Sequence, residues 1–182
     1  MHAVLFLDLQ EEIVKNSRTI SLQRLTATAT SLAKLAALHQ LPAIASSVPP
    51  GGAYLPSLIQ TLPSLAPRDR HQTTAASDEG LLAFLRDAKP EAVVISGVAS
   101  EIVVQRTTLD LLKAGFAVQL AVDAIGGIDA RTEDAAFSRM LAAGAVKTSV
   151  IALAAELAGD FTSATGGATL GIAYEAIGAA AL

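Results

Sequence analysis

The apolar residues of this chain occur in short continuous runs, separated by longer segments in which they recur every three or four positions. Residues 3–8 (AVLFLD) form one such run and end in an acid, which is typical of a parallel strand covered on both faces. We predict further strands in comparable runs at 42–47, 91–97, 116–123 and 145–150, with one short strand within the polar segment 66–79. The chain therefore supplies six candidate strands.

The segments between these runs carry the spacing of amphipathic helices. Within residues 19–40 the apolar positions are Leu22, Leu25, Ala29, Leu32, Leu35 and Leu38. Further helices are predicted at 79–88, about 101–114, about 130–142 and 151–159, with a short helix or a pair of turns at 55–65. Strands that alternate with helices imply right-handed crossovers and a parallel sheet. We expect a Rossmann-like, three-layer α/β/α fold with a six-stranded, mainly parallel sheet.

A single domain accounts for the chain, because 182 residues suffice for one core and show no internal repeat. We expect residues 1–160 to form this domain. Residues 161–182 make a tail rich in glycine and alanine, with Glu175 as its one charged residue. Because so apolar a tail is unfavourable in water, part of it should dock on the domain or on a neighbouring subunit. Docking on a neighbouring subunit would make the protein a homo-oligomer, a dimer or larger, and this is the assembly that we expect.

Composition and charge exclude several kinds of chemistry. Thirteen Lys and Arg against seventeen Asp and Glu give a net charge of −4, and no basic run is present to follow a phosphate backbone. Nucleic acid is therefore not expected as a partner. The chain has no cysteine, so it has no disulfide, thiolate metal site or thiol nucleophile. His2, His39 and His71 lack metal-ligand spacing, and we expect neither a metal nor a cofactor.

The apolar runs do not have the features of targeting or membrane segments. The N-terminal run lacks the basic start and the small-residue cleavage site of a signal peptide. No apolar stretch reaches the ~18 uninterrupted residues that a membrane helix needs. We therefore expect a cytoplasmic protein without a membrane partner.

In an open parallel sheet, ligands bind beyond the C-terminal strand ends, near the point where the strand order reverses. Asp8 and Asp123 each end a predicted strand. Asp8 is a candidate general base, or a carboxylate that orients a partner, and the alternative is a cap for a loop or helix. For Asp123 we favour a structural role, in which the carboxylate accepts backbone N–H groups.

Arg70, His71 and the turn at 97–103 (GVASEIV) are the other candidates. Arg70 offers a fixed positive charge, although loop arginines are usually solvated. His71 is a candidate proton shuttle, although a lone loop histidine rarely acts as one. We favour Ser100 as the N-cap of the following helix, since no Gly-x-Ser-x-Gly motif surrounds it. The backbone N–H groups of the turn suit an oxyanion or a carboxylate. The candidate ligand-binding residues are Val98, Ala99, Ser100 and His71.

Two segments resemble the isochorismatase-like superfamily, also called the cysteine hydrolases. Residues 3–12 (AVLFLDLQEE) resemble its first strand and acidic strand end. Residues 93–127 (VVISGVASEIVVQRTTLDLLKAGFAVQLAVDAIGG) resemble its next motif, a strand, a Gly-Val turn, a helix start and a strand ending in Asp-Ala. Residues 134–161 are most similar to the YcaC-like branch, whose members form oligomers. The resemblance covers nearly the whole chain and implies a six-stranded parallel sheet flanked by helices.

The resemblance implies a catalytic Asp, Lys and Cys, of which Asp8 alone is matched. The position of the nucleophilic Cys corresponds to Val103, which cannot attack a carbonyl, so hydrolysis through a thioester is excluded. Arg70 is the nearest match to the Lys, since its segment contains no lysine. The oxyanion hole of the family, associated with a cis peptide, would fall at Val98 and Ala99. The histidines of the nicotinamidase metal site have no counterpart after the second strand.

Two functions remain open. True isochorismatases also lack the cysteine and cleave a vinyl ether with an acid, so Asp8 and a water molecule, assisted by Arg70, are candidates for hydrolysis of a small molecule. Against this, Ser100, Glu101 and Val103 differ from the residues that those enzymes have in this turn. For Glu101, a place in the first turn of the helix is favoured over a role as the catalytic acid. The alternative is a pseudoenzyme that binds a small molecule or serves as an assembly subunit. A filled pocket would favour assembly.

Overall fold

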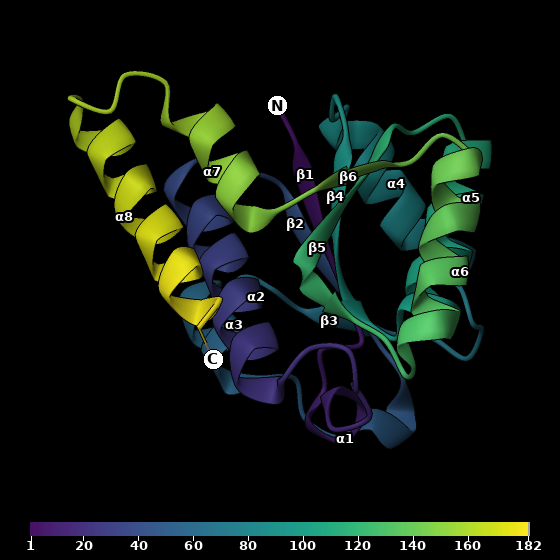
Figure 1. The fold of residues 1–182 in the computed structure, drawn as a ribbon. Coiled ribbons are helices and arrows are strands. Elements are labelled where there is room, and N and C mark those ends of the chain that lie inside the picture. The colour runs from purple at the N-terminus through teal and green to yellow at the C-terminus, as the bar shows by residue number, and fades with distance from the viewer. Residues whose placement is uncertain (182) are drawn as a thin grey trace.

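The computed structural model describes residues 1–181, in which helices cover both faces of one sheet (Figure 1). The strands are β1 (Ala3–Leu7), β2 (Ala43–Ser47), β3 (Pro67–Asp69), β4 (Val93–Val98), β5 (Val118–Gly126) and β6 (Val146–Thr148). They pair in the order β3-β2-β1-β4-β5-β6, and every pair is parallel. The predicted three-layer α/β/α fold with a six-stranded sheet is confirmed, and the sheet is wholly parallel.

Two layers of helices enclose the sheet (Figure 1). One layer contains α2 (Leu22–Leu38), α3 (Pro56–Thr61), α7 (Val150–Ala158) and α8 (Ala164–Ala179). The other contains α4 (Glu79–Ala88), α5 (Gln105–Lys113) and α6 (Ala130–Ala142). The connections carry the short helices α1 (Glu11–Val14), η1 (Pro49–Gly51) and η2 (Ala75–Ser77) and the π-helix η3 (Ser100–Val104). Within residues 1–181, no helix combines the length and apolar character needed to cross a membrane.

Strand β1 shows why its apolar run is unbroken. Successive side chains of a strand point to opposite faces of the sheet. Val4 and Phe6 accordingly pack with the layer of α2, while Leu5 and Leu7 pack with the layer of α4. All four side chains are fully buried. Since neither face meets water, no position in the strand favours a polar residue.

The order of the strands reverses between β1 and β4. From β1 the chain moves outward to β2 and β3, then returns to the opposite side of β1 to form β4, β5 and β6. Such a reversal leaves a crevice at the C-terminal ends of the two central strands. At this end Leu7 pairs with Gly97, so Asp8 lies next to the turn that follows β4. The fold therefore brings together Asp8 and the turn after β4, which the sequence patterns indicated as separate candidates.

Two local predictions were wrong. β5 does not end at Asp123 but continues to Gly126, with a shift in its pairing with β4 between Ile95 and Gly97. The helix predicted from about residue 101 begins with the π-helix η3, whose N-cap is Ala99 and not Ser100. In both places a local irregularity lies beside the crevice, where π-helical turns and shifted pairing are common in proteins.

The tail contains a helix that the apolar spacing did not predict. α8 packs against α2 and α7. The buried Thr169 hydroxyl lies 2.8 Å from His39 Nε2 at the end of α2, and Lys34 Nζ lies 2.5 Å from Glu175 Oε2. Small residues allow α8 to approach its neighbours closely, and for the same reason they supply no amphipathic pattern in the sequence. The outward side of α8 leaves Tyr174 exposed.

Candidate functional site

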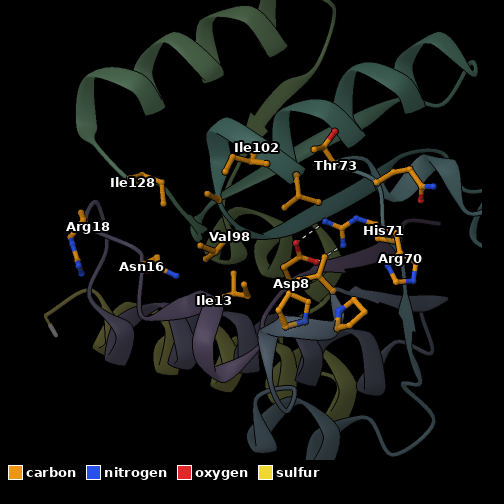
Figure 2. A pocket seen from close by; sticks show the side chains of 16 residues that line it. Asp8, Ile13, Asn16, Arg18, Arg70, His71, Thr73, Val98, Ile102 and Ile128 are labelled. Carbon is orange, nitrogen blue, oxygen red and sulfur yellow. Dashed lines mark hydrogen bonds and ion pairs between the residues drawn. The ribbon is translucent and has the colours of Figure 1, made fainter.

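A cavity of about 640 Å³ lies at the C-terminal ends of the central strands (Figure 2). Its polar and charged lining residues are Asp8, Asn16, Arg18, Arg70, His71, Gln72 and Thr73. Its apolar lining residues are Ile13, Val48, Pro49, Pro50, Val98, Ala99, Ile102, Val103 and Ile128. The volume falls within the range of ~300–1,000 Å³ that is usual for small-molecule sites. Six of the seven predicted site residues line this cavity, and Ser100 does not.

Asp8 and Arg70 form a buried ion pair with two parallel hydrogen bonds. Arg70 Nη1 donates to Asp8 Oδ1 at 2.5 Å, and Nη2 donates to Oδ2 at 2.7 Å. Each residue is only 5% exposed. Arg70 Nη1 also lies 3.1 Å from Ser46 Oγ and 3.3 Å from the carbonyl oxygen of Ser47, which hold the guanidinium against β2. Both oxygens of the Asp8 carboxylate are thus engaged before any ligand arrives.

The backbone of Asp8 suits this position. Its φ of 53° lies in the left-handed region, which Asp and Asn adopt more readily than other residues with a side chain. Its N–H donates to the Ser46 carbonyl oxygen at 3.0 Å, so the strand pairing with β2 extends to Asp8. The side chain then turns from the end of β1 towards Arg70 (Figure 2).

The charges of the pair largely compensate each other. Burial raises the pKa of the Asp8 carboxyl above its ordinary value, and the hydrogen bonds and positive charge of Arg70 oppose that rise. The guanidinium does not release its proton in proteins, whereas a buried lysine can do so. An Asp and Arg pair therefore fixes a carboxylate but supplies no second group that titrates.

The turn after β4 presents backbone and aliphatic side chains to the cavity. The peptide bond between Val98 and Ala99 is cis, at the position where the family resemblance places one. Val103 is 1% exposed and lies in the cavity wall, and Ile102 is 51% exposed. Ser100 is fully buried, and its hydroxyl lies 3.0 Å from Glu101 Oε2 and 3.2 Å from Glu133 Oε1. The structure therefore does not support Ser100 as a ligand-binding side chain.

Two nearby acids hold the N-termini of helices. Glu101 Oε1 accepts from the Ile128 N–H at 2.9 Å and from Thr132 Oγ1 at 2.8 Å at the start of α6. Burial raises the pKa of Glu101, but these hydrogen bonds outweigh it and lower the pKa below its ordinary value. Asp123 accepts from the Val150 N–H at 2.9 and 3.1 Å at the start of α7, which confirms the structural role predicted for it. Neither carboxylate lines the cavity.

The cavity also includes residues that the sequence patterns did not single out. Ile13, Arg18 and Ile128 come from connections on either side of the crevice (Figure 2). The Arg18 N–H donates to the Gly127 carbonyl oxygen at 2.8 Å and so joins the loop after α1 to the loop after β5. In the sequence Arg18 looks like an ordinary solvated charge, because the contact spans more than a hundred residues.

One wall of the cavity is held in place by the buried side chain of Gln10. Its Nε2 donates to the carbonyl oxygens of Val48 and Gly52 at 2.9 and 2.8 Å, and its Oε1 accepts from the Val48 N–H at 2.8 Å. These bonds satisfy all but one of the hydrogen-bonding sites of the amide. The wall formed by Val48, Pro49 and Pro50 is therefore pre-organised.

His71 is exposed at the other side of the cavity, next to Arg70. It lines the cavity, as predicted, but no ion pair involves it within residues 1–181. In the same part of the chain, no group of three or more His, Asp or Glu side chains is arranged to hold a metal ion. Besides His71, the acidic and basic side chains that line the cavity are those of Asp8, Arg70 and Arg18.

The fold and the crevice define an isochorismatase-type α/β domain. The Isochorismatase domain family matches residues 2–152. The chain therefore belongs to the isochorismatase family, as the resemblance of its motifs implies. No curated protein matches the chain.

Several solved structures are similar over nearly the whole chain. YcaC from Pseudomonas aeruginosa with hexane-2,5-diol and covalent acrylamide is 29% identical, with a TM-score of 0.87 over 94% of this chain and 88% of that chain. The YcaC gene product from Escherichia coli, described as an octameric hydrolase of unknown specificity, is 28% identical, with a TM-score of 0.86 over 93% and 85%. The MAR1 ribonuclease from Caenorhabditis elegans, at 24% identity and a TM-score of 0.84 over 94% and 88%, shares the fold. The similarity to the YcaC-like branch is thus confirmed.

Proposed function

We propose that this chain binds a small, largely apolar molecule in the cavity and does so without forming a thioester. The observation that carries the proposal is the open cavity itself, which Ile102 and Val103 line but do not fill. Nine of its sixteen lining residues are apolar. Transfer of apolar ligand surface from water to such walls is favourable. A filled pocket would instead have supported a role in assembly alone.

The chemistry of the lining residues supports binding over covalent catalysis. A thioester requires a thiol, and the chain has no cysteine. Val103, which we align with the nucleophile of the family, contributes only methyl groups to the wall. Arg70, which we align with the catalytic lysine, is held by Asp8 and cannot serve as a proton donor.

Hydrolysis by Asp8 and a water molecule is the second candidate. Its support is the position of Asp8 in the cavity wall and the effect of burial, which raises the pKa of that carboxyl and favours proton uptake. The two hydrogen bonds and the positive charge of Arg70 oppose it, because they lower the basicity of the Asp8 carboxylate. Binding does not depend on the basicity of Asp8, so it is the primary proposal.

A thermal-shift screen tests the proposal. The panel contains hexane-2,5-diol, small amides, vinyl ethers and carboxylates. Members that bind should raise the melting temperature, because they stabilise the folded state alone. Ile102→Trp should reduce the shift by narrowing the cavity. Val146→Trp, at a similarly exposed position outside the cavity, should not. Incubation of each binding member with the protein should give no product.

Two results would contradict this proposal in different ways. The absence of any shift across the panel would exclude binding of these ligand classes. Turnover that is lost in a folded Asp8→Asn variant would establish hydrolysis in place of binding alone. Asn suits this test, because it tolerates the left-handed backbone of Asp8 and keeps the shape of the side chain.

We also propose that the chain forms a homo-oligomer. Support comes from the E. coli relative, which is described as octameric, and from exposed apolar side chains at the C-terminal end. Phe161 is 65%, Tyr174 70% and Ile177 48% exposed. Tyr174 and Ile177 are three positions apart on α8, and exposed apolar side chains of this size favour contact with another subunit. Light scattering coupled to size-exclusion chromatography should give a multiple of 18.6 kDa, and a monomer mass would overturn the proposal.

A further inference from the structure

We infer that the cavity selects amphipathic monocarboxylates, with the carboxylate bound by Arg18 and the apolar body lying along the aliphatic walls. This inference rests on the proposed function, because it names the ligand class of the same cavity. It assigns a specificity-determining role to Arg18, which lies within the residues that the family matches but outside the motifs at 3–12, 93–127 and 134–161.

The polar groups of the cavity lie towards two ends (Figure 2). Arg70 and His71 are at one end, and Arg18 and Asn16 are at the other. Aliphatic side chains, among them Val98, lie between them. An elongated ligand that contacts both ends must therefore pass an apolar middle section.

The two ends differ in whether their arginine is ion-paired. At one end Arg70 is paired with Asp8, and the two charges compensate each other. At the other end Arg18 forms no ion pair within residues 1–181. The nearby carboxylate of Glu101 already accepts hydrogen bonds at the N-terminus of α6. Arg18 is therefore the lining arginine that no carboxylate pairs directly, and its guanidinium attracts an anion.

The guanidinium of Arg18 is positioned by its own loop. Its Nη1 donates to the carbonyl oxygen of Lys15 at 3.1 Å and lies 3.5 Å from that of Ser17. Its Nε and Nη2 have no hydrogen-bond partner among the described residues. These donors lie on one edge of the planar group, the arrangement that matches the two oxygens of a carboxylate. The loop is itself fixed by the bond from the Arg18 N–H to Gly127.

Charge and volume favour a monoanion with an apolar body. One carboxylate compensates the single unpaired charge of Arg18. A dianion such as a phosphate would bring a second charge against aliphatic walls that cannot pair it. A small polar acid would leave the apolar middle of the cavity unfilled. A medium-chain fatty acid meets both requirements, and octanoate is a suitable probe.

Calorimetric titration with octanoate and octan-1-ol tests the inference, because the two probes share the chain and differ in the charge. Octanoate is expected to bind the wild-type protein about tenfold more tightly, the effect of roughly one charge-assisted hydrogen bond at an exposed site. Added salt should reduce the difference. Arg18→Gln should remove the preference and leave octan-1-ol binding unchanged. Arg86→Gln, an exposed arginine on α4 outside the cavity, should leave both affinities unchanged.

Each other outcome is decisive. Equal affinity for the two probes in the wild-type protein would overturn the inference and leave the proposed function standing. A preference for octanoate that persists in Arg18→Gln would overturn the role of Arg18. Failure of both probes to bind folded wild-type protein would overturn the ligand class and count against an apolar ligand altogether.

Discussion

Arg70→Leu is expected to lower the free energy of unfolding by about 3–5 kcal/mol, because it leaves the Asp8 carboxylate buried without its partner. Urea denaturation of the variant and the wild-type protein at pH 7 measures this loss. The loss should become smaller as the pH is lowered. In the variant, burial still raises the pKa of Asp8 above 3.8, and nothing from Arg70 opposes the rise.

The sign of this pH dependence follows from proton binding. A carboxyl whose pKa is higher in the folded protein than in the unfolded chain takes up its proton more readily when folded. Its contribution to stability is therefore fully present below the unfolded pKa and is lost as the pH rises through the folded pKa. Arg70→Leu should consequently come closest to the wild-type protein in acidic buffer, as the pH falls towards the ordinary pKa of a carboxyl.

A second variant distinguishes the effect of leaving Asp8 without its ion-pair partner from the effect of losing the packing of the Arg70 side chain. In Asp8→Asn/Arg70→Leu no charge remains buried, so the double variant should be more stable than Arg70→Leu. Asn keeps the volume of Asp and tolerates the backbone at φ 53°. A loss below about 1 kcal/mol for Arg70→Leu would instead show that water reaches the Asp8 carboxylate and that the pair contributes little.

Gly97→Ala is expected to be at least as damaging, with a loss of about 3 kcal/mol or more. A β-carbon at this position would lie 2.3 Å from the Leu7 carbonyl oxygen and 2.6 Å from Leu7 Cβ. The backbone of Leu7 cannot withdraw easily, because β1 is hydrogen-bonded to β2 on one side and to β4 on the other. The substitution should separate the central strands at the crevice. Urea denaturation measures the loss of stability, and ligand titration should show weaker binding.

Gly171→Ala is the matched control for this substitution. Gly171 lies within α8, and a β-carbon there would meet no atom within 4 Å. Alanine should therefore stabilise the helix by roughly 0.5–1 kcal/mol, since it loses less backbone freedom on folding. If Gly97→Ala matched the stability of the wild-type protein, the close approach of β1 and β4 described here would be wrong.

The fold could be predicted because its signals are local. Each apolar run predicts one strand that is covered on both faces. Each amphipathic segment predicts one helix and the face of it that is buried. α8 escaped prediction because its buried residues are small and leave no periodic pattern. The continuation of β5 beyond Asp123 was not predicted, because a charged residue after an apolar run usually marks the end of a strand. In the structure the Asp123 carboxylate accepts a hydrogen bond from the N–H of Val150, so it is accommodated within the strand.

The candidate site was predicted in part. The rule that ligands bind at C-terminal strand ends selected Asp8, Arg70 and Val103, and all three line one cavity. The same rule gave Ser100 a role in the cavity, because a pattern of residues does not tell which side of an irregular turn a side chain occupies. Arg18 was missed because nothing within its own segment distinguishes it from a solvated arginine.

The sequence by itself determined the covering of both sheet faces and the exclusion of thioester chemistry, since a chain without cysteine has no thiol in any conformation. Tertiary structure alone decided that Asp8 and Arg70, 62 positions apart, bind each other, and that the cavity beside Val103 stays open. The physical reason is the separation along the chain over which each kind of signal acts. Periodicity and residue chemistry act over a few positions, whereas an ion pair and a cavity depend on distances that are set only when distant segments pack together.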